Sequence, residues 1–127
     1  MTVGFQTTNL VNNWLNMLRG TAFTAPAAIY AKLHTADPGA AGTTSPSAVT
    51  TRSAVTFSAA SAGALALSNT PSFTMTTSET ISHVSYWDNV SAGNLLWTAA
   101  LTTPKAVVNT DVLQLTSVGV SLAPLAV

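Results

Sequence analysis

Side chains suited to acid–base or metal chemistry near neutral pH are few in this sequence: four carboxylates and two histidines. A glycosidase, or another small hydrolase, needs two carboxylates that face one bond. Asp37 lies in an Asp-Pro-Gly turn and Asp111 in an Asn-Thr-Asp turn, where capping of the turn explains both. Glu79 and Asp88 bracket a run of strand-forming residues, where capping is again the favoured interpretation. We therefore predict no catalytic residue and keep an Asp88–Glu79 pair only as an alternative.

The two histidines, His34 and His83, do not form a recognisable metal-binding pattern. Neither lies in a His-x-x-x-His or His-Glu-x-x-His spacing, and a zinc site needs three or four ligands. A mixed site of His83 with Asp88 is the alternative, but hydrogen-bonded strand histidines are the simpler explanation. The sequence also lacks cysteine, a Gly-x-Ser-x-Gly motif and a phosphate-binding loop with its lysine. We predict no metal and no cofactor.

Scarcity of charge limits the partners of this chain. Charged residues make up 6% of the sequence, and four basic residues balance four acidic ones; a typical soluble domain has about 25% charged residues. Binding to nucleic acid or to an anionic membrane requires a basic surface, so we predict neither partner. No stretch is apolar for the roughly 18 residues of a membrane span. The sequence has no basic residue before Arg19 and no cysteine, which favours folding in the cytoplasm without a secretory signal.

One helix is predicted near the N-terminus, over residues 7–19. Its apolar residues recur at three- and four-residue spacing, Gly20 can end it, and a threonine or asparagine at its start can cap it. The apolar residues of this helix are Leu10, Val11, Trp14, Leu15 and Leu18. The asparagines among them are poor helix formers, so the helix needs tertiary packing.

From residue 27 onward the hydrophobic period changes from that of a helix to that of strands. Ile29, Ala31 and Leu33 alternate with polar residues, and a turn follows. Residues 37–50 are almost all small, which predicts a long exposed loop. Short alternating runs continue to Leu122, and we expect Pro104 to end one of them. The prediction is a single, mainly β domain over 1–127: a jelly-roll-like antiparallel β-sandwich of about 7–8 short strands over 27–127, with one N-terminal α-helix.

Three places in the sequence are candidates for contact with another protein. Adjacent strand residues point to opposite faces, so either Tyr86 or Trp87 should point outward, to anchor an interface or stack on a sugar. Asp37 and Pro38 open the small-residue loop, which could contact a neighbour. The C-terminal stretch is apolar to its last residue and is either a final core strand or a docking segment. Candidate interface residues are Tyr86, Trp87, Asp37, Pro38, Leu125 and Val127.

The order of several short motifs resembles a family of small virion proteins of tailed phages, often phages of actinobacteria. The motifs are Leu33-His34-Thr35-Ala36-Asp37-Pro38-Gly39, Arg52-Ser53-Ala54-Val55-Thr56-Phe57, Ile81-Ser82-His83-Val84-Ser85-Tyr86-Trp87-Asp88, Gly93-Asn94-Leu95-Leu96-Trp97 and Leu101-Thr102-Thr103-Pro104-Lys105. The sequence departs from the family around Arg52, where members commonly have a tyrosine before the arginine and a glutamine after it. Members are labelled tail-fibre-like, minor capsid, head-decoration or head-fibre proteins. The resemblance provides no catalytic residue to carry over.

The resemblance implies a non-enzymatic structural protein of the virion, assembled in the host cytoplasm. Our leading expectation is a capsid decoration or minor capsid protein on the outer face of the lattice. Its partners would be the major capsid protein and copies of itself, with a trimer as the simplest arrangement at local threefold positions. The alternatives are a tail-fibre or minor tail protein that binds host-surface glycan, and a small cell-wall hydrolase.

Overall fold

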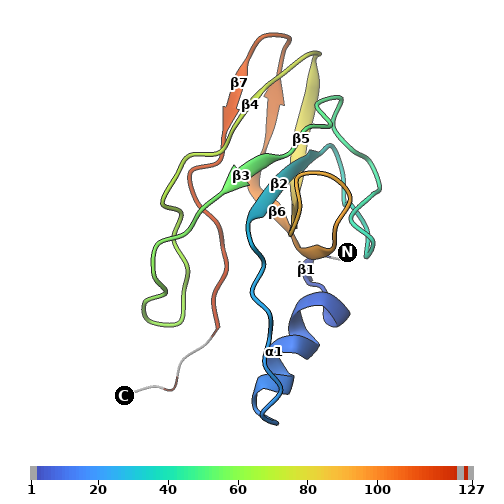
Figure 1. The fold of residues 1–127 in the computed structure, drawn as a ribbon. Helices are drawn as coiled ribbons and strands as arrows, with labels where there is room; N and C mark the ends of the chain where they lie inside the picture. The colour runs from blue at the N-terminus through green and yellow to red at the C-terminus, as the bar shows by residue number, and fades with distance from the viewer. Residues whose placement is uncertain (1–2, 123–124, 126–127) are drawn as a thin grey trace.

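The computed structural model describes residues 3–122 and 125, which form two antiparallel sheets and one short helical segment (Figure 1). The larger sheet has the strand order β1-β6-β5-β2-β3; its strands are Gly4–Phe5, Leu95–Val107, Glu79–Trp87, Ile29–His34 and Ser53–Val55. The smaller sheet pairs β4 (Ser72–Thr74) with β7 (Val112–Gln114). The predicted mainly β, antiparallel sandwich with one N-terminal helix is confirmed.

Alternating apolar residues of the central strands build the core, as expected from a strand period of two. Ala31 and Leu33 of β2 are fully buried, and Val84 and Tyr86 of β5 lie beside them. The Tyr86 ring stacks on Trp97 of β6 with ring centroids 4.4 Å apart. Residues from the smaller sheet and from the connecting segments complete the core; they include Val49, Phe73, Met75, Leu115 and Val120.

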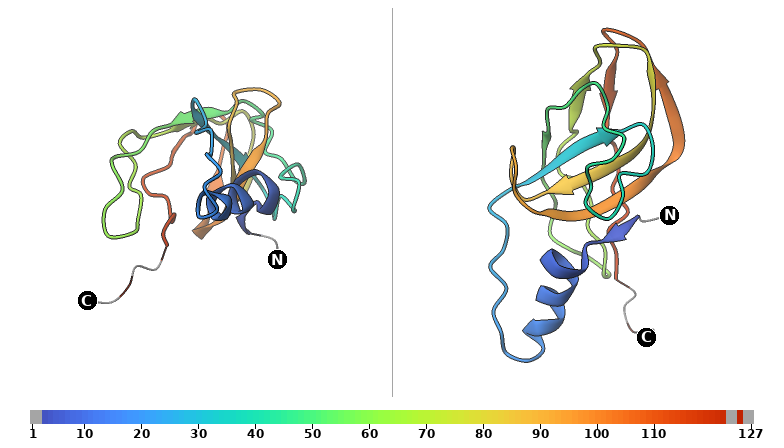
Figure 2. Two further views of the ribbon diagram at one scale, coloured as in Figure 1. Left: turned by 60° about the horizontal axis from the view of Figure 1, so that its bottom comes forward. Right: turned by 90° about the vertical axis from the view of Figure 1, so that its right-hand side faces the viewer.

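The predicted helix begins at residue 7, as expected, but has two parts. A π-helical turn (Thr7–Val11) continues into α1 (Asn12–Met17), and the Gln6 side chain accepts a hydrogen bond from the Asn9 N–H at 2.7 Å. Gly20 takes the left-handed conformation that ends such a helix (φ +85°). The helix extends away from the two sheets, on the side where the described chain also ends (Figures 1 and 2).

Residues 37–50 form a long loop with seven of fourteen residues exposed, but the loop is packed against the larger sheet, which was not predicted. The Thr35 N–H donates to Ser45 O at 2.9 Å and the Ser47 N–H donates to Leu33 O at 3.0 Å. Pro38, Gly42, Ser47 and Val49 are buried. Figure 2 shows the loop crossing in front of β2 and β5 in its right-hand view. The loop is ordered despite its small side chains because its backbone forms these hydrogen bonds.

Strand β6 also differs from its prediction, because it continues through Pro104 to Val107. Ala100 pairs with His83 and Lys105 pairs with Ile81, so residues 101–104 lie opposite Ser82 alone. A proline is tolerated at such a bulge because no ladder hydrogen bond is required from it. On its other edge β6 pairs with β1 only through Trp97 and Thr98.

Two of the alternating runs, at residues 65–67 and 118–122, form irregular segments held by isolated bridges instead of strands. Phe57 pairs with Leu67, Ser61 with Ala64, and Ala64 with Ser121. The Leu122 N–H donates to Gly63 O at 2.7 Å, and Val120 O accepts from the Leu65 N–H at 3.0 Å. These bonds fix the path of the C-terminal segment as far as Leu122. Among the described residues, no helix is long and apolar enough to cross a membrane.

Candidate interaction surfaces

A chain of buried hydrogen bonds ties loop 37–50 to the larger sheet. His34 Nδ1 lies 2.9 Å from Thr44 O and Nε2 lies 2.7 Å from Ser85 Oγ, while Trp87 Nε1 donates to the same hydroxyl at 2.8 Å. A carbonyl only accepts, so Nδ1 carries the proton and Nε2 accepts from Ser85. Burial lowers the pKa of His34 and is the largest cause. The hydrogen bond to Thr44 raises this pKa, and the positive charge of Lys32 lowers it further. The neutral ring therefore suits this site.

Arg52 fastens the turn that follows β5. Its guanidinium carbon lies 4.1 Å from the centroid of the Trp87 ring, which is cation–π geometry. One of its nitrogens donates to Asn89 O and to Ala92 O, each at 2.6 Å. The arginine therefore serves the fold locally, and it covers an aromatic ring that would otherwise face solvent.

The expectation that either Tyr86 or Trp87 points outward is wrong. Tyr86 is 3% exposed and Trp87 is 7% exposed. Tyr86 lies in the core, where burial raises its pKa to about 12. Trp87 lies on the opposite face, but Arg52 and Gly42 cover it; a β-carbon at Gly42 would lie 3.0 Å from its ring. Neither ring offers an exposed surface to a partner or a sugar.

Asp37 and Pro38 stabilise the start of the loop. Asp37 Oδ1 accepts a hydrogen bond from the Gly39 N–H at 2.9 Å, which is the turn capping expected of it. Pro38 is buried, and its carbonyl accepts from the Thr44 N–H at 3.0 Å. Burial removes Pro38 from the contact surface, while the half-buried Asp37 can still border one.

The remaining carboxylates also cap loops. Asp88 accepts from the Asn94 backbone and side chain, at 2.7 and 2.9 Å. Asp111 accepts from the Val108 N–H at 2.9 Å, and Glu79 accepts from the Ser47 hydroxyl and from a loop N–H. No three His, Cys, Asp or Glu side chains cluster as metal ligands among residues 3–122. His83 instead lies 2.7 Å from the hydroxyl of its neighbour Ser82.

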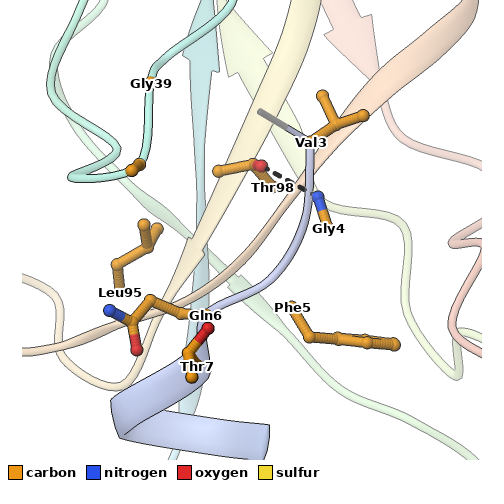
Figure 3. Close-up of a pocket in the computed structure, with 9 residues that line it drawn as sticks. Val3, Gly4, Phe5, Gln6, Thr7, Gly39, Leu95 and Thr98 are labelled. Atoms are coloured by element: carbon orange, nitrogen blue, oxygen red, sulfur yellow. Dashed lines mark hydrogen bonds between the residues drawn. The ribbon is translucent and has the colours of Figure 1, made fainter. Parts of the chain in front are cut away.

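Two shallow pockets contain polar groups, but most of these groups form hydrogen bonds within the protein. The first, of about 200 Å³, lies between β1 and Gly39 (Figure 3). Its lining has no charged side chain, and the Gly4 N–H in it donates to Thr98 Oγ1 at 3.3 Å. The second, of about 440 Å³, contains Asp88 and Asn94, which bond to each other. Neither pocket offers a set of free charged groups to a ligand.

The helix leaves a large apolar surface uncovered. At 100° per residue, Leu10, Trp14 and Met17 share one face, while Val11, Leu15 and Leu18 share another about 100° away. The first face meets the body of the protein, where Leu10 is buried and Trp14 packs edge-on against Phe5 with ring centroids 5.2 Å apart, although Met17 at its end is 50% exposed. Leu15 is 57% exposed and Leu18 is 87% exposed. The sequence analysis treated these apolar residues as one set that needs tertiary packing; the width of their stripe was the signal that part of it had no cover.

An apolar groove of about 320 Å³ lies at the base of this helix. The residues around it are aliphatic or aromatic, and none is charged: Leu10, Trp14, Met17, Phe23, Ala25, Pro26, Ile29, Leu65, Leu96, Trp97 and Val120. The C-terminal segment leaves the body beside it, with Leu122 59% and Leu125 92% exposed. Val127 lies outside the described residues. We call the groove, the second face of the helix and Leu122 with Leu125 the helix-end surface.

Charge is almost absent from the helix-end surface. Arg19 is the one charged residue within residues 3–28, and the sequence after Asp111 has none. Extended exposed apolar surface marks candidate contact sites for another molecule. The helix-end surface is therefore a better candidate for contact with another protein than the Tyr86–Trp87 pair.

Comparison with known families bears on the same question. The sequence matches the family Gp80, described as Podophage GP4 fiber I protein gp80, over residues 6–123. No curated protein matches it. The family match covers the helix, loop 37–50 and every strand except β1, and it confirms the resemblance to tailed-phage virion proteins. The chain thus belongs to the Gp80 family of podophage fibre proteins.

Proposed function

We propose that this chain is a non-enzymatic fibre subunit of a podophage particle, which joins other subunits through its helix-end surface. The family is described by the word fibre, and a fibre subunit works by contact with further protein. The observation that carries the proposal is the uncharged, exposed apolar surface beside the groove, which includes Leu15, Leu18 and Leu125. Exposure of such a surface to water is unfavourable, and a partner that covers it gains the free energy of burial.

The partners we propose are copies of the same chain and the protein of the particle to which the fibre attaches. The major capsid protein is one such attachment point, since a fibre can be mounted on a head as well as on a tail. Our first expectation, a decoration protein spread over the capsid lattice, needs the same kind of apolar contact. The fibre assignment is preferred because the family description names it.

Glycan binding and hydrolysis have less support in the geometry. The expected aromatic anchor for a sugar is missing, since Tyr86 and Trp87 are both buried. The carboxylates of Glu79 and Asp88 accept hydrogen bonds from separate loops rather than facing each other across one cleft. A structural role therefore accounts for these residues without a substrate.

Localisation in the intact particle tests the proposal directly. Gold-labelled antibodies against the purified chain should mark fibres in cryo-electron micrographs, and the density of those fibres should accommodate the seven-stranded fold. Particles from a phage that lacks the gene provide the control. Label spread evenly over the head lattice would favour a decoration protein instead, and unlabelled purified particles would overturn a virion role.

A further inference from the structure

We propose that the segment containing Leu122 and Leu125 of one copy lies in the apolar groove of a second copy. The inference deepens the proposed function and rests on it, because it assumes that copies of the chain assemble with each other. It names the two surfaces that meet: the groove lined by Trp14, Met17 and Phe23, and the exposed leucines that follow Val120.

The groove has the size and chemistry to hold two leucine side chains. An apolar cavity of about 150 Å³ is enough to bind benzene, which is larger than a leucine side chain. The groove offers about 320 Å³, and its walls are helix residues, residues 23–29, and the side chains of Leu65, Leu96, Trp97 and Val120. Walls this poor in hydrogen-bonding groups repay little of the hydration that a charged or polar occupant would lose.

The segment matches the groove in chemistry but is not buried by its own chain. The backbone is fixed beside the groove, because Val120 O accepts from the Leu65 N–H and the Leu122 N–H donates to Gly63 O. Past this point Leu122 is half exposed and Leu125 is almost fully exposed. The chain therefore holds Leu122 two residues after the groove residue Val120 and leaves both Leu122 and Leu125 exposed to water.

A second copy is the occupant that fits these observations. One chain has both the projecting leucines and the receiving groove, and neither has a charge that would select a charged partner. Contact between different surfaces of identical chains is head-to-tail, which builds a closed ring or a continuing filament. Leu15 and Leu18, on the helix face next to the groove, then lie within reach of the same contact.

Disulfide cross-linking tests the contact, and the absence of native cysteine makes the result unambiguous. Met17→Cys in one full-length preparation and Leu125→Cys in another, isotopically labelled, are mixed and oxidised mildly. Val108→Cys replaces Met17→Cys in the matched control, because Val108 is similarly exposed (54% against 50%) but does not line the groove. The Met17–Leu125 heterodimer should exceed the Val108–Leu125 heterodimer about tenfold, as a difference of 1.4 kcal/mol would give.

Two outcomes would overturn the inference. One is equal yield of the two heterodimers. The other is an intramolecular disulfide in a chain with both Met17→Cys and Leu125→Cys, which would mean that the segment folds into its own groove. As a second measurement, Leu125→Asp should lower self-association in sedimentation experiments while the chain stays folded, since Leu125 is exposed. These readouts use the purified chain, so their failure is separate from failure to find the protein in fibres.

Discussion

Loop 37–50 and the helix-end surface contrast with what their compositions predict: the loop, poor in apolar residues, is packed, and the helix end, rich in them, is exposed. The loop has almost no large apolar side chain, yet backbone hydrogen bonds, the His34–Ser85–Trp87 chain and Glu79 hold it against the sheet. The helix end is rich in leucine, yet Leu15 and Leu18 are exposed. The difference teaches that satisfied polar groups can order a segment that buries little, and that apolar residues without a local neighbour remain available for another chain.

The largest effect is expected where the loop meets the sheet, at Gly42. Its φ of +70° favours glycine, and an added β-carbon would lie 2.7 Å from Leu95 Cδ1 and 3.0 Å from the Trp87 ring. Gly42→Ala should lower the free energy of unfolding by about 1–3 kcal/mol through backbone strain and overpacking. Urea denaturation of the purified chain measures this.

Gly119→Ala is the matched control, because an added β-carbon there meets nothing within 4 Å and the backbone is not left-handed. Its stability should match that of the parent chain. An equal loss in both variants, or none at Gly42, would mean that the loop does not rest tightly on the sheet.

A smaller effect is expected from acid, through His34. The pKa of this ring is lowered in the folded chain, mainly by burial, with Lys32 and His83 adding to the effect and carbonyls of the loop opposing it. Below the usual value of 6.5 the unfolded chain binds a proton that the folded chain does not, so stability should fall as pH falls from that value toward the lowered pKa. Denaturation at several pH values between about 7.5 and 5.5 checks the sign.

His34→Gln keeps side-chain hydrogen-bonding groups at this site but does not titrate. The variant is expected to be less stable at every pH and to lose the decline over that window. A parent chain whose stability rises with acid would contradict a buried neutral histidine.

The smallest effect on the isolated chain is expected at the helix end. Leu18→Ser replaces a side chain that is 87% exposed, so the free energy of unfolding in dilute solution should change by no more than about 0.5 kcal/mol. Leu10→Ser, on the buried face of the same helix, provides the contrast and should be clearly destabilised. If Leu18→Ser were as damaging as Leu10→Ser, the outer helix face would already be covered within one chain.

The fold class was predictable from the sequence because period-two alternation directly reports a half-buried strand. Ala31 and Leu33 are in the core as the pattern required. The loop was not predictable in the same way, since its order depends on His34, which is itself bonded to the distant Ser85, and on Glu79, which is 32 residues from Ser47. The prediction that Tyr86 and Trp87 point to opposite faces was correct, but no local pattern could reveal that Arg52 covers Trp87.

The bulge in β6 has a consequence for how copies can meet. Open strand edges allow sheets to join and aggregate. Beyond Thr98 the outer edge of β6 has no strand partner among the described residues, but Pro104 lacks an N–H to donate and residues 101–104 depart from regular pairing. A strand approaching there would also have to desolvate the Lys105 ammonium. Sideways growth of the sheet at this edge is thereby discouraged, which leaves side-chain contacts for the assembly proposed above.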